Sequence, residues 1–340
     1  AASIAIGDLA LLLVGPASAA LGAWALWRLF RDRPEWERAG AVLAWLSFPP
    51  VLLYANRGLY PNLPVVALVL AGLAAWRHAS ASSSRVLAGF AVGLAAAIRP
   101  TEIVWIAAWV AAAAWLERKE GRPRGSGWFF ALAGCAVPLV LVAAVHALTY
   151  GAPWLVGYAL RDPAIVAASA TPVAPRWTWP FGFHPRAMWF HIRGYLFGSL
   201  LPWTLAVAGA AFAWLWPHRV ERKPWRAHPE AWSLFVAGGW TLAAVVLMYG
   251  QAVYQDHVGV NVVSSGNSFL RYALPLAPFF ALAVGRLVQA ARDEVRIPPA
   301  VRKPAAAVLV AAFVALGIFQ ATYRDEEGIA ASRRALAGYA

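Results

Sequence analysis

Long apolar stretches separated by short polar turns dominate this chain, and the positive charge is concentrated in every second turn. Nineteen of the 29 Lys and Arg residues lie in five turns, at 28–38, 77–85, 117–126, 217–230 and 286–304. Positive charge marks the cytoplasmic side of a membrane protein. The pattern therefore predicts an all-α, polytopic membrane protein in which alternate turns face the cytoplasm.

The composition agrees with this prediction, because 61% of the residues are hydrophobic and 13% are charged, far from the balance of a soluble domain. A net charge of +13 would indicate nucleic acid in a soluble protein. Here, insertion topology and anionic lipid headgroups account for it. We expect membrane lipids as partners and no nucleic acid. The single cysteine, Cys135, leaves no disulfide within the chain.

The apolar stretches predict about ten transmembrane helices. A full span needs roughly 20 residues, and four of the stretches are shorter. We interpret these four as two short hairpins, 39–76 and 86–116. The ten stretches are 9–27, 39–55, 63–76, 86–98, 103–116, 128–149, 194–216, 231–250, 272–289 and 305–320.

Each short hairpin has a polar apex that we expect to lie below the outer membrane surface. Pro100 would break a continuous helix through 86–116. One apex is therefore Arg99 to Glu102, and the other is 56–62. Polar backbone at membrane depth is tolerated only where protein or water surrounds it. Two recessed apexes on one side predict a shared cavity there.

The outer loops are uneven in length, and a long outer loop is predicted at 150–193. The basic turns have no room for a nucleotide-using domain, and the chain lacks a phosphate-binding glycine loop. We therefore treat 1–340 as a single transmembrane domain and expect any chemistry at the outer face. The spacing Gly89-xxx-Gly93 predicts close helix packing.

Five residues of the two apexes are candidates for binding. Arg99 and Glu102 are ionisable groups at membrane depth, which usually mark a site, although an internal ion pair explains them too. Arg57, Tyr60 and Asn62 combine a cation, a phenol and an amide. Such a set suits a phosphate or sugar hydroxyls, while snorkelling and turn chemistry are the simpler explanation.

Two basic pairs recur seven residues apart in the long loop, as His184 with Arg186 and His191 with Arg193. If 184–193 is helical, the pairs share one face and suit the phosphate of an anionic lipid. An ordinary interfacial anchor explains them equally well. Two histidines without a further ligand do not make a metal site, so we assign no metal.

Four stretches of this chain resemble the GT-C glycosyltransferases, multi-span enzymes that take a sugar from a polyprenyl-phosphate donor. The stretch 45–64 contains Leu-Tyr-Pro-Asn-Leu-Pro, with Asn62 where bacterial members often have Glu. The others are Ile-Arg-Pro-Thr at 98–101, the Thr-Tyr-Gly-Ala-Pro-Trp-Leu-Val-Gly-Tyr run that ends at 158, and Arg-Tyr-x-x-Pro-x-x-Pro from 271. Their order and sidedness carry the resemblance over most of 9–290.

The front of the chain departs from this family. Members have a cytoplasmic N-terminus, a first span and then a large outer loop with the catalytic Asp or Glu. Residues 1–8 carry no positive charge, which places the start of this chain outside, and Asp8 abuts a span. We therefore expect the native chain to begin upstream, with its catalytic base in the preceding loop. The acidic loop that would hold any divalent metal is expected there too, and no other cofactor is indicated.

The resemblance implies a membrane glycosyltransferase of the bacterial inner membrane with its active face outside. A polyprenyl-phosphate-linked sugar would be the donor, and a lipid, glycan or protein the acceptor. The implied phosphate ligands are Arg57, Arg99 and Arg271, and the implied sugar or acceptor pocket contains Tyr60, Asn62, Glu102 and Tyr158. A transporter or flippase of lipid-linked sugars, and a polysaccharide ligase or polymerase of another family, are the alternatives.

Overall fold

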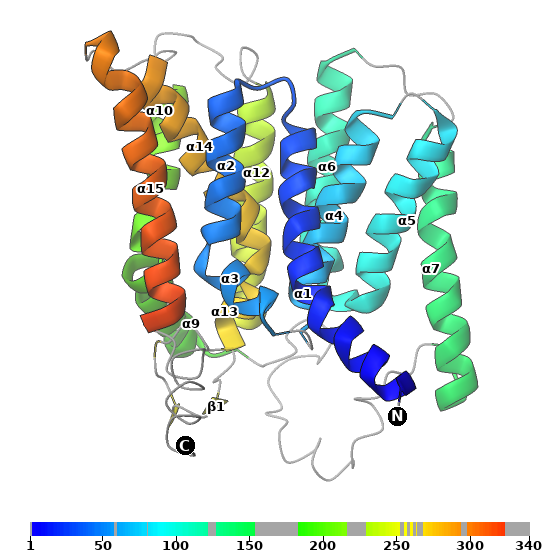
Figure 1. The fold of residues 1–340 in the computed structure, drawn as a ribbon. Helices are drawn as coiled ribbons and strands as arrows, with labels where there is room; N and C mark the ends of the chain where they lie inside the picture. The colour runs from blue at the N-terminus through cyan, green and yellow to red at the C-terminus, as the bar shows by residue number, and fades with distance from the viewer. Residues whose placement is uncertain are drawn as a thin grey trace.

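The computed structural model describes residues 2–57, 60–79, 81–121, 127–153, 183–215, 229–251, 255–256, 259–260, 263, 268–293 and 298–323. Within these residues the protein is almost entirely helical, and the helices form one bundle with most axes along a common direction (Figure 1). A two-residue antiparallel pair, β1 (Gln255–Asp256) with β2 (Gly259–Val260), is the only sheet in this part of the chain.

The first half of the bundle runs from α1 to α7. Its helices are α1 (Ala2–Leu29), α2 (Glu35–Ser47), α3 (Pro49–Ala55), α4 (Asn62–Arg77), α5 (Ser82–Ile98), the 3₁₀ turn η1 (Pro100–Glu102), α6 (Ile103–Lys119) and α7 (Gly127–Tyr150).

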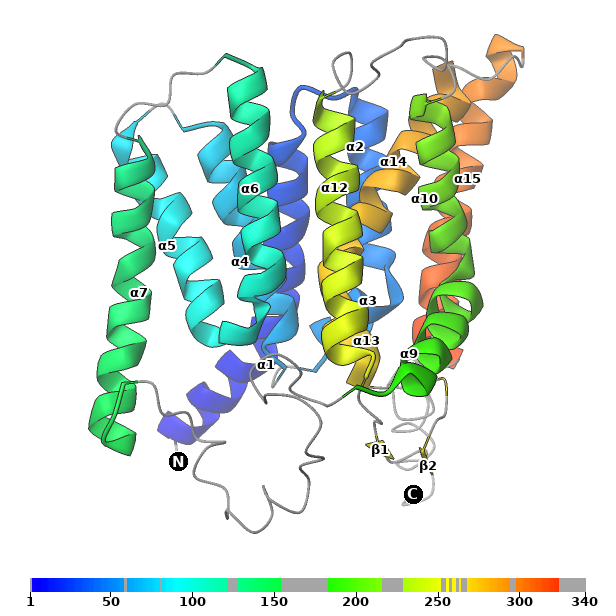
Figure 2. The same cartoon turned by 180° about the vertical axis from the view of Figure 1, so that it is seen from behind.

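The second half is more irregular, because two of its helices contain π-helical segments. It comprises α9 (Pro185–His191), the π-helix η3 (Ile192–Ser199), α10 (Leu201–Leu215), α12 (Pro229–Ala244), the π-helix η4 (Val245–Tyr249), α13 (Ser268–Tyr272), the 3₁₀ turn η5 (Leu274–Leu276), α14 (Ala277–Asp293) and α15 (Pro299–Tyr323). Seen from behind, α12, α14, α10 and α15 form one side of the bundle and α7 the far edge of the other (Figure 2).

The predicted all-α fold class is confirmed, but the predicted number of about ten transmembrane spans is not. Five helices among the described residues are long and apolar enough to cross a membrane, and up to eight if each of three bent pairs is one span. Helices occupy most of each of the ten predicted apolar stretches, yet several are short or bent, so about ten spans are not confirmed. Such long apolar helices are compatible with an integral membrane protein.

Prolines explain the breaks in both predicted hairpins. Pro100 lacks an amide hydrogen and follows an extended Arg99, and α5 and the segment through α6 meet there at 118°. Pro49 and Pro50 end α2 at Ser47, where it meets α3 at 57°. The depth of both apexes in a membrane stays a prediction, because helix length and composition do not fix it. The predicted loop 150–193 is shorter than expected, since α9 and η3 occupy 185–199.

Small residues let α5 and α7 pack closely, as the glycine spacing predicts. A Cβ on Gly89 would lie 1.9 Å from the backbone oxygen of Ala131, and one on Gly93 would lie 2.3 Å from that of Cys135. Gly134 approaches Val86 in the same way from the other side. Any larger side chain at these positions would push the two helices apart.

The buried core includes residues of α1, α2, α3, α4, α6, α10 and α14, and aromatic side chains pack within it. Phe48 packs edge-on against Trp203 at 5.0 Å and stacks on Phe280 at 5.4 Å. Trp45 is fully buried and donates from Nε1 to the carbonyl of Ala19 at 2.9 Å. The apolar window in α14 is 78% buried, whereas that in α7 is 11% buried, so α7 exposes an apolar surface suited to lipid.

Candidate functional site

The two polar apexes lie side by side at one end of the bundle. Arg99 donates from Nη1 to Oδ1 of Asn62 at 2.9 Å, which ties the second apex to the first. Asn62 is 4% exposed and begins α4, so its amide is fixed by the helix as well as by the arginine. The two apexes therefore meet in the structure, and the shared cavity expected between them stays a prediction.

Glu102 is the buried anchor of this site. Its side chain is buried, with its residue 2% exposed, and its Oε1 lies 2.9 Å from Nε of Arg99. Trp105 Nε1 donates to Oε2, and the Tyr249 hydroxyl donates toward Oε1 at 3.2 Å. With three partners and almost no exposure, Glu102 holds its neighbours in place rather than opening into a pocket.

A pair of stacked tyrosines joins the apexes to the later helices. Tyr249, the last residue of η4, stacks on Tyr272 of α13 with ring centroids 4.2 Å apart and planes 7° apart. The Tyr249 hydroxyl also lies 3.0 Å from Oγ1 of Thr101. Because π-helical segments widen a helix locally and are frequent at functional sites, the position of Tyr249 at the end of η4 is notable.

Two guanidinium groups converge on Tyr272. The guanidinium carbon of Arg99 lies 5.1 Å from the ring centroid and that of Arg271 lies 4.8 Å from it. Arg271 also donates to the Tyr272 hydroxyl at 3.0 Å and lies 5.3 Å from the ring of Tyr60. Aromatic faces attract cations, and such contacts hold the two positive charges near each other.

Arg271 differs from Arg99 in its charge balance. Arg99 has Glu102 as its counter-ion, but Arg271 makes no ion pair with any described residue. Its Nε is buried and has no hydrogen-bond partner among the described atoms. A partly buried cation without a counter-ion is costly, so this geometry favours a bound anion.

Three further residues were predicted to bind the phosphate or the sugar. Arg57 is half-buried at the first apex, where its carbonyl accepts from the amide of Tyr60 at 3.3 Å. Tyr60 packs edge-on against Tyr54 at 5.4 Å. Tyr158 lies outside the described residues.

The prediction that the two basic pairs share one exposed helix face is wrong for one of the four residues. His184, Arg186 and Arg193 are exposed, but His191 is 3% exposed. The His191 ring stacks on Phe269 at 4.5 Å, and its Nδ1 lies 3.0 Å from the carbonyl of Gly250. The helix α9 begins at Pro185, so His184 has a non-helical backbone and spacing by seven does not keep His184 and His191 on one face.

A long apolar groove runs between α6 and α12 and begins beside the site. Its volume is about 910 Å³, and Val104, two residues after Glu102, lies at one end. Trp240 donates from Nε1 to the Val104 carbonyl at 3.0 Å there. The rest of its wall is mostly alanine and tryptophan: Ala107, Ala108, Ala111, Ala112, Trp115, Trp232, Ser233 and Val236.

The sequence predictions name most residues of this cluster but not Tyr249 and Trp105. Both are aromatic residues inside apolar helices, where an aromatic side chain is ordinarily part of the core, and no local pattern distinguishes them. Comparison with family models, curated proteins and solved structures returns no match to this chain. Within the described residues, no cluster of three or more metal-ligating side chains is present.

Proposed function

We propose that this protein is a membrane glycosyltransferase that takes a sugar from a polyprenyl-phosphate donor at the outer face of a bacterial inner membrane. The observation that carries the proposal is Arg271, a partly buried cation with no counter-ion among the described residues. A phosphate diester supplies that counter-ion and accepts charge-assisted hydrogen bonds from a guanidinium.

The arginines have different roles in this proposal. Arg271 binds the donor phosphate directly, and Arg57 of the first apex is the proposed second phosphate ligand. Arg99 is already paired with Glu102 and with Asn62, so it contributes positive potential and orients the first apex. Tyr60, which lies against Arg271, shapes the entrance to the sugar.

The groove between α6 and α12 supports a lipid-linked donor. It is apolar, has a volume of about 910 Å³ and begins next to Glu102, so a phosphate at Arg271 and an isoprenoid chain in the groove belong to one molecule. Burial of each methylene in such a groove contributes about 0.8 kcal/mol. This arrangement needs no nucleotide site, in agreement with the absence of a nucleotide-binding motif from the sequence.

The reaction forms one bond and breaks one. The oxygen of an acceptor hydroxyl forms the new bond to the anomeric carbon, and its proton passes to a carboxylate. The bond from the anomeric carbon to the phosphate oxygen breaks, and its electron pair leaves with the polyprenyl phosphate, whose charge the arginines stabilise. Glu102 is committed to Arg99, Trp105 and Tyr249, so we do not assign it as the proton acceptor.

The test is a transfer assay in vesicles that contain the native protein, with a radiolabelled sugar on a polyprenyl phosphate. We expect a new glycosidic bond, release of polyprenyl phosphate, and loss of both in Arg271→Gln. An exposed residue far from the site provides a matched control, Arg118→Gln, which should transfer normally. Intact donor crossing the bilayer without any new bond would contradict the proposal and favour a transporter.

A further inference from the structure

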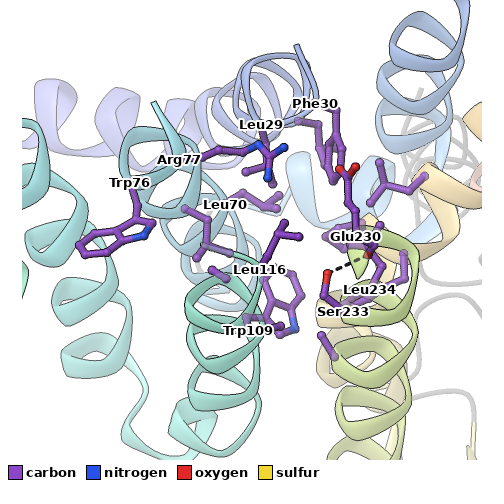
Figure 3. A pocket seen from close by; sticks show the side chains of 18 of the residues that line it. Leu29, Phe30, Leu70, Trp76, Arg77, Trp109, Leu116, Glu230, Ser233 and Leu234 are labelled. Atoms are coloured by element: carbon purple, nitrogen blue, oxygen red, sulfur yellow. Dashed lines mark hydrogen bonds between the residues drawn. The ribbon is translucent and has the colours of Figure 1, made fainter. Parts of the chain in front are cut away.

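Another apolar groove runs between α10 and α12, on the other face of α12 from the groove beside α6. Its volume is about 260 Å³, and no residue of its wall is charged. Leu196 of η3 and Leu276 of η5 belong to its wall at the site end of the bundle. The two grooves share no lining residue. At its far end this groove shares Leu234, Phe279 and Leu282 with the small apolar cavity of Figure 3.

A glycine of α12 leaves the groove between α10 and α12 open. A Cβ on Gly239 would meet no atom within 4 Å, and Leu242, one turn later, is 37% exposed. On α10 the lining residues run from Thr204 to Trp214, which spans about 15 Å of helix. This length is half of the roughly 30 Å of a bilayer core. The groove therefore suits one acyl chain of one leaflet.

The helix at the site end of this groove crosses the end of the bundle. α10 runs along the bundle (Figure 2), and the segment formed by α9 and η3 meets it at 80°. This segment exposes Trp189 by 59% and Phe197 by 57%. Exposed aromatic side chains on a helix in the membrane plane are typical of the headgroup region. The segment therefore places headgroup contacts next to the end of the groove.

Arg193 is an exposed cation beside this end of the groove. Its side chain makes no ion pair or hydrogen bond with any described residue. It precedes Leu196 by three residues, and side chains three apart on a helix are neighbours. Arg186 is exposed on the same segment, but ten residues separate it from Leu196, about 15 Å along a helix. Of these two arginines, Arg193 is the one within reach of the groove.

The charges at this end of the bundle favour an anion. The helices α9, η3, α10, η4, α13 and η5 contain no Asp or Glu. Glu102 is the counter-ion of Arg99, and the other acidic residues in described elements of this end are Asp8 of α1 and Asp256 of β1 (Figure 1). These three carboxylates accompany five arginines of the described residues there: Arg57, Arg99, Arg186, Arg193 and Arg271.

We infer that the groove between α10 and α12 holds one acyl chain of an anionic phospholipid whose headgroup phosphate binds Arg193. The uncharged walls accept the chain, and a guanidinium donates paired hydrogen bonds to a phosphate. The excess of cations favours a headgroup with net negative charge over a zwitterionic one. The site lies on the other face of α12 from the proposed donor groove, so it does not rest on the proposed function and stands if that function fails.

The first test measures phospholipid retention by the purified protein. Native mass spectrometry in a mild detergent with added phosphatidylglycerol should show one tightly held molecule. Gly239→Leu fills the groove from a position with open space around it and should abolish this retention. Ala243→Leu adds the same side chain to the exposed surface of α12, outside both grooves, and should keep it. Equal retention by the two variants, or no tightly held lipid in the unaltered protein, would overturn the inference.

The second test addresses the headgroup, with phosphatidylglycerol and phosphatidylethanolamine of identical chains. We expect a preference for phosphatidylglycerol of about two- to fivefold, the value of one exposed charge interaction. Arg193→Gln breaks no ion pair with a described residue, so the fold should persist while this preference disappears. Arg186→Gln makes the same change two turns earlier on the same helix and should keep it. A preference unchanged in Arg193→Gln, or lost equally in both variants, would show that the phosphate does not bind Arg193.

Discussion

The two ends of the bundle hold their charges differently. At the site end, Arg99 and Arg271 lie over Tyr272, and the pair of Arg99 with Glu102 is buried. The opposite end, here called the cavity end, contains an apolar cavity of about 100 Å³ (Figure 3). There Arg33 and Arg77 each pair with two carboxylates, and these pairs are closer to solvent. The comparison teaches that ion pairs of the same chemistry differ in burial, and burial decides what breaking each one costs.

The largest effect is expected for Glu102→Gln. Removing one partner of a buried ion pair leaves Arg99 without its counter-ion, which costs about 3–5 kcal/mol of the free energy of unfolding. Thermal or detergent denaturation of the purified protein measures this loss. The matched change at the cavity end, Glu120→Gln, should cost at most about 1 kcal/mol because that pair is more exposed. Equal losses at both ends would remove the contrast between them.

Arg271→Gln should separate binding from stability. Charge-assisted hydrogen bonds contribute about 1.5–3 kcal/mol, so the affinity for a polyprenyl phosphate should fall roughly 10- to 100-fold. The melting temperature should fall only slightly, because Arg271 loses a hydrogen bond to Tyr272 and two aromatic contacts but no ion pair with a described residue. Arg77→Gln at the cavity end serves as the control and should bind the phosphate normally. A normal affinity in Arg271→Gln would refute its assignment as the phosphate ligand.

Two substitutions of Tyr249 should lower the free energy of unfolding by different amounts. Tyr249→Phe keeps the stack on Tyr272 but loses the hydrogen bonds to Thr101 and Glu102, at a cost of about 1 kcal/mol. Tyr249→Leu also loses the ring stack and should cost about 0.5–1.5 kcal/mol more. Denaturation of both variants tests the order. If the two variants were equally stable, the ring stack would not join the two segments.

The smallest effect is expected for Glu230→Gln at the cavity end. Its pair with Arg33 is about a quarter exposed, so the loss should be about 0.2–1 kcal/mol and should shrink at high salt. Melting curves at low and high salt measure it. The Glu102→Gln loss should not change with salt, because its pair is buried. A strong salt dependence at Glu102 would place that pair near solvent.

The sequence predicted the apolar helices and the break at Pro100, because hydropathy and proline act locally. It also brought Arg99, Asn62, Tyr60, Glu102 and Arg271 to one side through the alternation of basic turns. The sequence did not predict the role of Tyr249 or the burial of His191. Tyr249 ends a π-helical segment, which no residue pattern indicates, and His191 is buried by contacts with Phe269 and Gly250, which are distant in sequence.

The glutamates that line the cavity were also hidden from the sequence. Glu117 and Glu120 stand beside Arg118 and Lys119 along the chain, so the turn is basic overall. The helix places Glu117 and Glu120 toward the cavity, and three-residue spacing brings them to one face. Only the packing of α6 against α4 and α12 decides which face of that turn becomes the wall of a cavity.

The most direct test of the phosphate site compares a polyprenyl phosphate with the same polyprenol, each carrying a photoreactive isoprene unit, bound to the purified protein. We predict at least tenfold tighter binding of the phosphate, with crosslinks along α6 and α12 beside the groove. Equal binding of the alcohol, or crosslinks only on helices that do not line the groove, would contradict a phosphate site at Arg271.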